Sequence, residues 1–98
     1  MATTVFKKTF HLSEIRDDDS VDLSLPSGSE ILTVAEQFKD SKSLQVWYRC
    51  CPDAPKVSRK LFVVGTGNPA PNKSRASYIS TAILGGGGLV LHFFDGAR

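Results

Sequence analysis

Short stretches in which apolar and polar residues alternate run through most of this chain. In Leu44–Cys51, for example, Leu44, Val46, Tyr48 and Cys50 share one parity and polar or mixed residues take the other. A period of two indicates a strand with one face in the core. The pattern predicts about seven strands, at Val5–Leu12, Val21–Leu25, Glu30–Phe38, Leu44–Cys51, Val57–Val64, Ser77–Leu84 and Leu89–Phe94.

Glu30–Phe38 is the least clear of these segments. Its apolar residues fit helical spacing as well as a strand buried on both faces. Its β-branched content, and the turn-forming residues on either side, favour a strand. The turns are Pro26–Ser29 before it and Lys39–Ser43 after it.

Turn signals recur roughly every 8–14 residues, a spacing that predicts an all-β, single-domain antiparallel sandwich or small barrel. The two architectures stay open at this stage. With 98 residues the chain has room for one domain, 1–98, in which Asp95–Arg98 is expected to form a short tail. The expected core consists of Phe6, Phe10, Leu23, Leu25, Val34, Val46, Leu61, Val63, Ile79, Ile83, Leu91 and Phe93.

Charge is nearly balanced, with 12 Lys and Arg against 10 Asp and Glu, a net charge of +2. The basic residues are scattered rather than clustered, so nucleic acid is not an expected partner. The N-terminus has no apolar core of signal-peptide length, and no apolar run approaches the ~20 residues that cross a bilayer. We therefore expect a cytoplasmic protein without a membrane partner.

Cys50 and Cys51 are adjacent, so on a strand they point to opposite faces and are not expected to form a disulfide. His11 and His92 are the only imidazoles, and no zinc-ligand spacing occurs. The triplet at 17–19, Asp-Asp-Asp, favours a solvated loop over a cation site. We expect no metal and no cofactor.

Two glycine-rich turns are candidates for binding. The first, Gly65–Asn68, follows a predicted strand and is followed by prolines. It lacks both the phosphate-loop pattern and the dinucleotide fingerprint. It is either a structural turn or an anion contact made by backbone amides with nearby cations. The second, Gly85–Gly88, is favoured as a hairpin tip over a close approach to a ligand or partner. The candidate anion contacts are Gly65, Thr66, Gly67, Asn68, Lys73 and Arg75.

Trp47 and Arg49 are of residue types enriched at binding hot spots. Trp47 and Tyr48 must face opposite sides of their strand, so Trp47 either packs in the core or forms an exposed face with Arg49. No serine lies in a nucleophile elbow and no triad is recognisable, so we expect no catalytic residue and no enzyme. His92 is expected to be a packed or rim imidazole.

Five segments occur in an order that resembles a widespread, uncharacterised family of small proteins encoded by tailed bacteriophages. The resemblance extends from about Phe6 to the C-terminal strand. Its most specific parts are Gly-Thr-Gly-(His/Asn)-Pro, where Asn68 stands at a position at which histidine is common, and Gly-Gly-x-Leu-Val-x-His-x-Phe. The segments are LPSGSEILTVA at 25–35, PDAP at 52–55, FVVGTGNP at 62–69, YIST at 78–81 and GGLVLHFF at 87–94, and an aromatic strand with Trp47 lies between the first two.

This resemblance implies a phage gene product in the cytoplasm of the host bacterium, without catalytic residues to carry over. The expected function is that of a non-catalytic accessory protein that binds and inhibits a host enzyme or antiphage-defence component. Two alternatives stay open: a virion component that decorates the capsid or assists the tail, and a sponge that sequesters a nucleotide signal. The expected partners are accordingly a host or phage protein, a phosphate-bearing small ligand, or a second copy of the chain.

Overall fold

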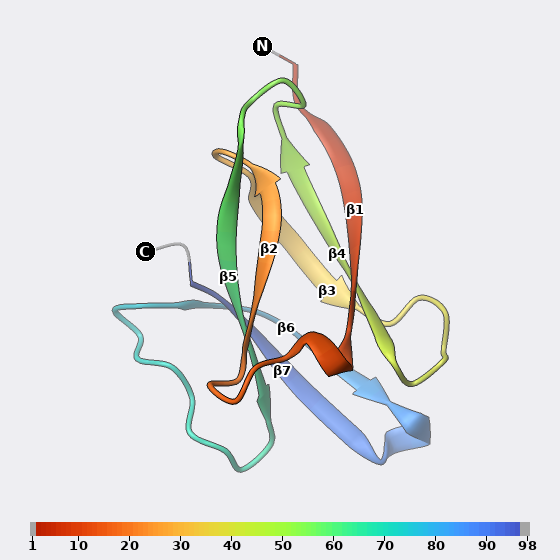
Figure 1. Ribbon diagram of the computed structural model, residues 1–98. Coiled ribbons are helices and arrows are strands. Elements are labelled where there is room, and N and C mark those ends of the chain that lie inside the picture. Colours follow the sequence, from red (N-terminus) through yellow and green to blue (C-terminus); the bar gives the residue numbers. More distant parts are fainter. Residues whose placement is uncertain (1, 97–98) are drawn as a thin grey trace.

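The computed structural model describes residues 2–96, and its seven strands form two antiparallel sheets (Figure 1). Strands β1, β4 and β3 form a three-stranded sheet in that order, and β2, β5, β7 and β6 form a four-stranded sheet. The all-β fold is confirmed, and the architecture is a sandwich rather than a closed barrel. The strands are β1 (Thr4–His11), β2 (Ser20–Pro26), β3 (Glu30–Ala35), β4 (Ser43–Cys50), β5 (Lys56–Gly65), β6 (Ser77–Leu84) and β7 (Leu89–Asp95).

Strand boundaries agree with the sequence pattern to within a few residues, and the segment that begins at Glu30 is a strand. That strand ends at Ala35, earlier than predicted, because the chain then folds back over β4: the Gln37 amide donates to Gln45 Oε1 at 2.7 Å. At the other end of the chain, β7 includes Asp95, and the Gly96 amide donates to the carbonyl of Lys60 at 2.9 Å. The rest of the predicted tail, residues 97–98, lies outside the described residues.

Only two connections join strands that pair with each other, the β3–β4 and β6–β7 hairpins. The chain changes sheet between β1 and β2, between β2 and β3 and between β4 and β5, and β5 pairs with β2 and β7 rather than with β6. In Figure 1 the long β5–β6 connection extends away from both sheets at lower left. The short 3₁₀ turns η1 (Leu12–Glu14) and η2 (Gly85–Gly87) are the helical pieces of the described chain.

The inner faces of the two sheets form one hydrophobic core. Alternation along the strands places the predicted residues there because one parity of each strand faces the other sheet. Leu44, Tyr48 and Leu84 join the expected core residues. The expected residues that are buried are Phe10, Leu23, Leu25, Val34, Val46, Leu61, Val63, Leu91 and Phe93.

Two predicted core residues are exposed, so those assignments were wrong. Phe6 is 41% exposed because β1 is an edge strand, and its ring meets Tyr48 edge-on, 6.2 Å between centroids. Ile83 is 63% exposed because its parity on β6 faces outward, opposite Val90. Ile79 lies at a β-bulge in β6 and packs against the core while half-buried.

Polar contacts connect the two sheets at their borders. Ser80 Oγ on β6 donates to the Val34 carbonyl on β3 at 2.8 Å and accepts from the Val34 amide at 3.1 Å. Elsewhere, Arg59 forms a bidentate pair with Asp95, at 2.9 and 2.7 Å, and donates to the Ser29 carbonyl at 2.7 Å. Because Ser29 lies in the turn between β2 and β3, this arginine joins the four-stranded sheet to the point where the chain leaves it.

Candidate functional site

The outer face of the three-stranded sheet carries an aromatic and basic surface. Strand register places Lys7 of β1 opposite Trp47 of β4, and Val5 opposite Arg49. Thr33 and Glu30 of β3 complete the same two rows, and Glu30 pairs with Arg49 through its carboxylate. We call this surface the Trp47 face and define it by Val5, Lys7, Glu30, Phe38, Trp47 and Arg49.

Trp47 does not pack in the core, which corrects the first of the two alternatives. Its neighbour Tyr48 occupies the core position, 6% exposed, and burial raises the pKa of the Tyr48 phenol. Trp47 is half-buried on the outer face with the exposed Arg49 beside it in sequence. Trp47 therefore lies on the outer face with Arg49, as in the other alternative, but is half-buried there.

The loop that follows β3 adds an exposed ring to the Trp47 face. Phe38 is 57% exposed, and Lys7 Nζ lies 4.9 Å from its ring centroid. The same ammonium donates to Gln37 Oε1 at 2.6 Å. Val5, 55% exposed, continues the apolar surface along the edge strand. Cations and apolar side chains therefore lie together on one open sheet face.

A row of three aromatic residues crosses the outer face of the four-stranded sheet. Phe94 on β7 lies opposite Phe62 on β5 and opposite Tyr78 on β6, so the three rings occupy adjacent strands on one face. Tyr78 and Phe94 meet edge-to-face, with centroids 5.7 Å apart. We call these three residues the aromatic row.

Next to the aromatic row, a chain of hydrogen bonds crosses the sheet. His92 Nε2 lies 2.7 Å from Thr66 Oγ1, and His92 Nδ1 lies 2.9 Å from Thr81 Oγ1. Tyr78 OH lies 2.7 Å from the same Thr81 oxygen. In a neutral imidazole one ring nitrogen donates and the other accepts, so the two threonines fix the ring in either tautomer. His92 is thus a half-buried rim imidazole on the outer face.

Sequence reasoning missed this chain as a unit. Thr81 and His92 are opposite each other only because β6 and β7 pair in this register. The Gly-rich hairpin turn was the one local signal that brought them near, and it does not specify which residues face each other.

The structure divides the predicted binding residues between the two sheets. Trp47 and Arg49 belong to the Trp47 face. Gly65 and Asn68 close a turn, with the Asn68 amide 3.1 Å from the Gly65 carbonyl, and Gly67 has a φ of 93°. In the same turn, Thr66 contacts His92 of the four-stranded sheet. Further along this connection, Arg75 lines a cavity beside Phe62, and Lys73 is exposed.

Asp18 of the aspartate triplet lies in a surface network with Arg16 and Lys60, and Arg16 also engages Asp22. Arg16 pairs with Asp22, and the pKa of the Asp22 carboxyl is lowered chiefly by that hydrogen bond. The Ser20 hydroxyl donates to Asp18 and is the main cause of its lowered pKa. Within residues 2–96, no group of three or more His, Cys, Asp or Glu side chains is placed to hold a metal ion. Among residues 2–96, Cys50 and Cys51 are not joined by a disulfide.

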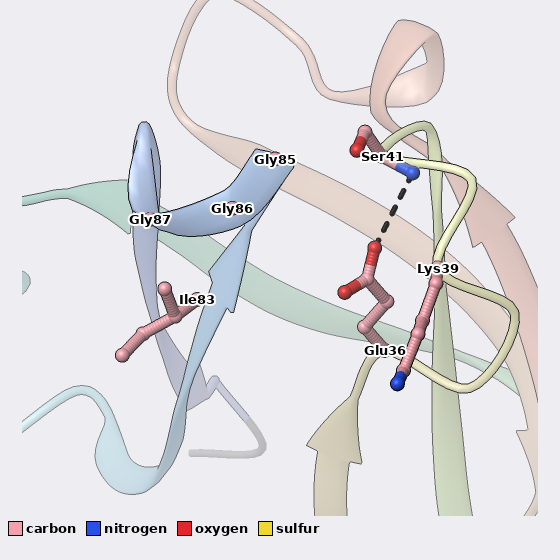
Figure 2. Close-up of a pocket in the computed structure, with 7 residues that line it drawn as sticks. All are labelled: Glu36, Lys39, Ser41, Ile83, Gly85, Gly86 and Gly87. Carbon is pink, nitrogen blue, oxygen red and sulfur yellow. Dashed lines mark hydrogen bonds between the residues drawn. The ribbon is translucent and has the colours of Figure 1, made fainter.

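A pocket of about 360 Å³ opens between the β3–β4 loop and the glycine turn of the β6–β7 hairpin. Figure 2 shows Glu36 and Lys39 on one side of it and the glycine turn with Ile83 on the other. The Ser41 amide donates to Glu36 Oε2 at 3.3 Å across the loop. The glycine turn is thus both the hairpin tip that was favoured and one wall of a pocket.

These features define an all-β, two-layer sandwich with the Trp47 face on one outer surface and the aromatic row on the other. The chain belongs to a family described as a domain of unknown function (DUF7352), which matches residues 1–98. Comparison with curated proteins and with solved structures gives no match. No helix among residues 2–96 is long and apolar enough to span a membrane.

Proposed function

We propose that this protein is a non-catalytic accessory protein of a tailed bacteriophage, and that it acts by binding a protein of the host through its Trp47 face. The observation that carries the proposal is the grouping of Trp47, Arg49 and the 57%-exposed Phe38 on one outer sheet face. Tryptophan and arginine are the residue types that contribute most per residue to protein interfaces. The sequence resemblance supports the phage origin.

The charged and apolar side chains of the Trp47 face indicate what kind of surface the partner has. Lys7 and Arg49 carry positive charge and Glu30 offsets one of them, so the face is net basic. A complementary surface has an apolar pocket for Phe38 and carboxylates at its rim, because rim charges steer the encounter and a desolvated aromatic anchor gives the affinity. A host enzyme or an antiphage-defence component with such a surface is inhibited if the bound domain covers its active site or binding site.

A photo-crosslinking residue at position 38 tests the proposal in infected bacteria. The crosslinked host protein is purified, and its affinity for the wild-type chain is measured by calorimetry. We expect Phe38→Ala/Arg49→Ala to weaken binding at least about tenfold, the loss of roughly 1.4 kcal/mol or more. The matched control is Val57→Ala/Lys56→Ala, which removes one exposed apolar and one cationic side chain from the other sheet.

Equal affinities for the two double variants would contradict the assignment of the Trp47 face. Recovery of virion proteins alone in the crosslink, together with the presence of the chain in purified particles, would instead support the virion alternative. Native mass spectrometry of the same samples reports the composition of the complex.

A further inference from the structure

The aromatic row exposes ring surface to solvent on the outer face of the four-stranded sheet, on the other side of the sandwich from the Trp47 face. Tyr78 is 59% exposed, and the hydrogen bond between its phenol and the Thr81 hydroxyl holds the end of the side chain in place. Phe94 and Phe62 continue the row over two further strands and are half-buried. Neighbouring strands are about 4.8 Å apart, so the row covers roughly 10 Å of sheet. Because the planes of the Tyr78 and Phe94 rings are 68° apart, a planar ligand can stack on one ring of the row and extend its substituents along the others.

Two cations lie at the Phe62 end of the row. Lys60, Phe62, Arg75 and Gly96 line a cavity of about 210 Å³, and Lys60 Nζ is 5.7 Å from the Phe62 ring centroid. The cavity is continuous in its lining with a second one of about 520 Å³, since Lys60 and Gly96 border both. Ammonium and guanidinium groups beside a cavity of this kind are the donors that phosphate groups select.

The close packing of Gly96 keeps this corner compact. A Cβ at Gly96 would lie 2.9 Å from Phe62 Cε2 and 3.1 Å from the Lys60 carbonyl. Any other residue would displace either the ring or the strand that carries Lys60. The glycine thus lets the end of β7 lie against the ring without filling the cavity between the two cations.

We propose that this corner of the four-stranded sheet binds a nucleotide, with the base stacked on the aromatic row and the phosphate between Lys60 and Arg75. Stacking needs no particular base, because every base presents a π-face. The two cations supply charge-assisted hydrogen bonds to phosphate oxygens. The site is on the other sheet from the Trp47 face, so it stands or falls independently of the proposed function.

Charge at the site sets the strength of binding. Asp18 lies 3.7 Å from Lys60 Nζ, longer than a direct hydrogen bond, and Asp22 is engaged by Arg16. One weakly held carboxylate therefore competes with the phosphate for Lys60. We expect modest affinity that falls with added salt.

The nucleotide can be free in solution or part of a single strand, and the two sources share the chemistry of a base next to a phosphate. Tight binding to a duplex needs a dense group of cations, which this face lacks, whereas stacking on an aromatic ring does not depend on dense positive charge. A chain of 98 residues is well suited to amide chemical-shift titration, which both measures weak binding and locates it. The probes are adenosine monophosphate, an eight-residue oligouridylate and inorganic phosphate.

We expect adenosine monophosphate or the oligouridylate to shift amides of β5, β6 and β7 around the aromatic row, with Kd below about 1 mM. Stronger binding of the monophosphate identifies a free nucleotide as the ligand, and stronger binding of the oligomer identifies a strand. Binding of inorganic phosphate as tightly as either one would overturn the proposal, because the row would then contribute nothing. No shift with either nucleotide probe at 5 mM, roughly the weakest range that titration resolves, would overturn it as well.

Variants test the two halves of the site. Tyr78→Leu removes the π-face but keeps apolar area, and Arg75→Glu reverses one cation; each is expected to weaken nucleotide binding about tenfold. Lys42→Gln, a loss of an exposed cation in the β3–β4 loop, is the matched control and should leave binding unchanged. Unchanged binding in both site variants, with native amide spectra, would refute the site.

Discussion

At the scale of single residues, Asp40 organises a loop that the sequence marks only as polar. Its Oδ1 accepts from the amides of Lys42 and Ser43, both at 2.9 Å, and its Oδ2 accepts from the Ser43 hydroxyl at 2.9 Å. The flanking residues Lys39 and Ser41 have φ of 55° and 59°, the left-handed region that favours glycine. The carboxylate stabilises this strained loop and so shapes the pocket that the loop borders.

The bond from the Lys42 amide, followed by those of Ser43, lowers the pKa of Asp40 from its ordinary value of 3.8. Because the folded pKa lies below the unfolded one, the stabilisation is fully present above about pH 4 and is lost as the pH falls through the folded pKa. We expect Asp40→Asn to lower the stability at neutral pH and to match the wild type increasingly as the pH falls below about 4. Chemical denaturation at pH 7 and at lower pH measures the gap, and a gap that stays constant would contradict this role.

At the scale of elements, the β6–β7 hairpin depends on consecutive glycines in its turn. Gly85, Gly86 and Gly87 have φ of 59°, 68° and 105°, whereas Gly88 has a right-handed φ of −77°. A Cβ at Gly86 would contact nothing within 4 Å, so conformation rather than space demands glycine there. The turn sets the register of β6 and β7 and therefore which residues meet on the outer face.

Gly86→Ala should destabilise the protein by about 1–2 kcal/mol, the cost of a left-handed backbone at a residue with a Cβ. The matched variant Gly88→Ala should be neutral or slightly stabilising, because its backbone suits alanine and its nearest contact, the Gly85 carbonyl, lies at 3.5 Å. Urea denaturation of the two variants measures the difference. Equal changes in the two variants would contradict the assignment of the loss to the left-handed backbone of Gly86.

At the scale of the whole molecule, the border of the sandwich holds an ion pair that is neither fully buried nor open. The side chains of Arg59 and Asp95 are 14% and 19% exposed, and the arginine also holds the Ser29 carbonyl. The pair connects β5 and β7 within one sheet and reaches the turn that leads to the other. It therefore supports the relative position of the two layers.

Asp95→Asn should cost about 2 kcal/mol of unfolding free energy, because it leaves a half-buried guanidinium without its carboxylate and sets an amide donor against a donor. Glu30→Gln is the control, since it removes a carboxylate from the exposed pair with Arg49, where about 0–1 kcal/mol is expected. Thermal unfolding of both variants provides the comparison. Equal losses of unfolding free energy in the two variants would contradict the expectation that the half-buried pair contributes more to stability than the exposed one.

The sequence predicted the strands well and the surfaces only in part. Alternation is a local property with a period of two, so Leu44, Val46 and Tyr48 identified their strand and its inner parity without knowledge of the rest of the chain. The same local pattern failed at Phe6, where it could not reveal an edge strand. It also left Trp47 undecided, because other parts of the chain can cover the outer face of a strand and a local pattern does not show them.

What the sequence determined by itself is the set of strands, their turns and most of the core. Tertiary structure alone decided which strands pair, that the sheets form an open sandwich, and which side chains meet outside. The aromatic row joins residues 62, 78 and 94, and the hydrogen-bond chain joins Thr66 to His92, only through the pairing of β5, β7 and β6. Pairing and register depend on the packing of the whole chain, because each strand offers the same backbone donors and acceptors to any neighbour.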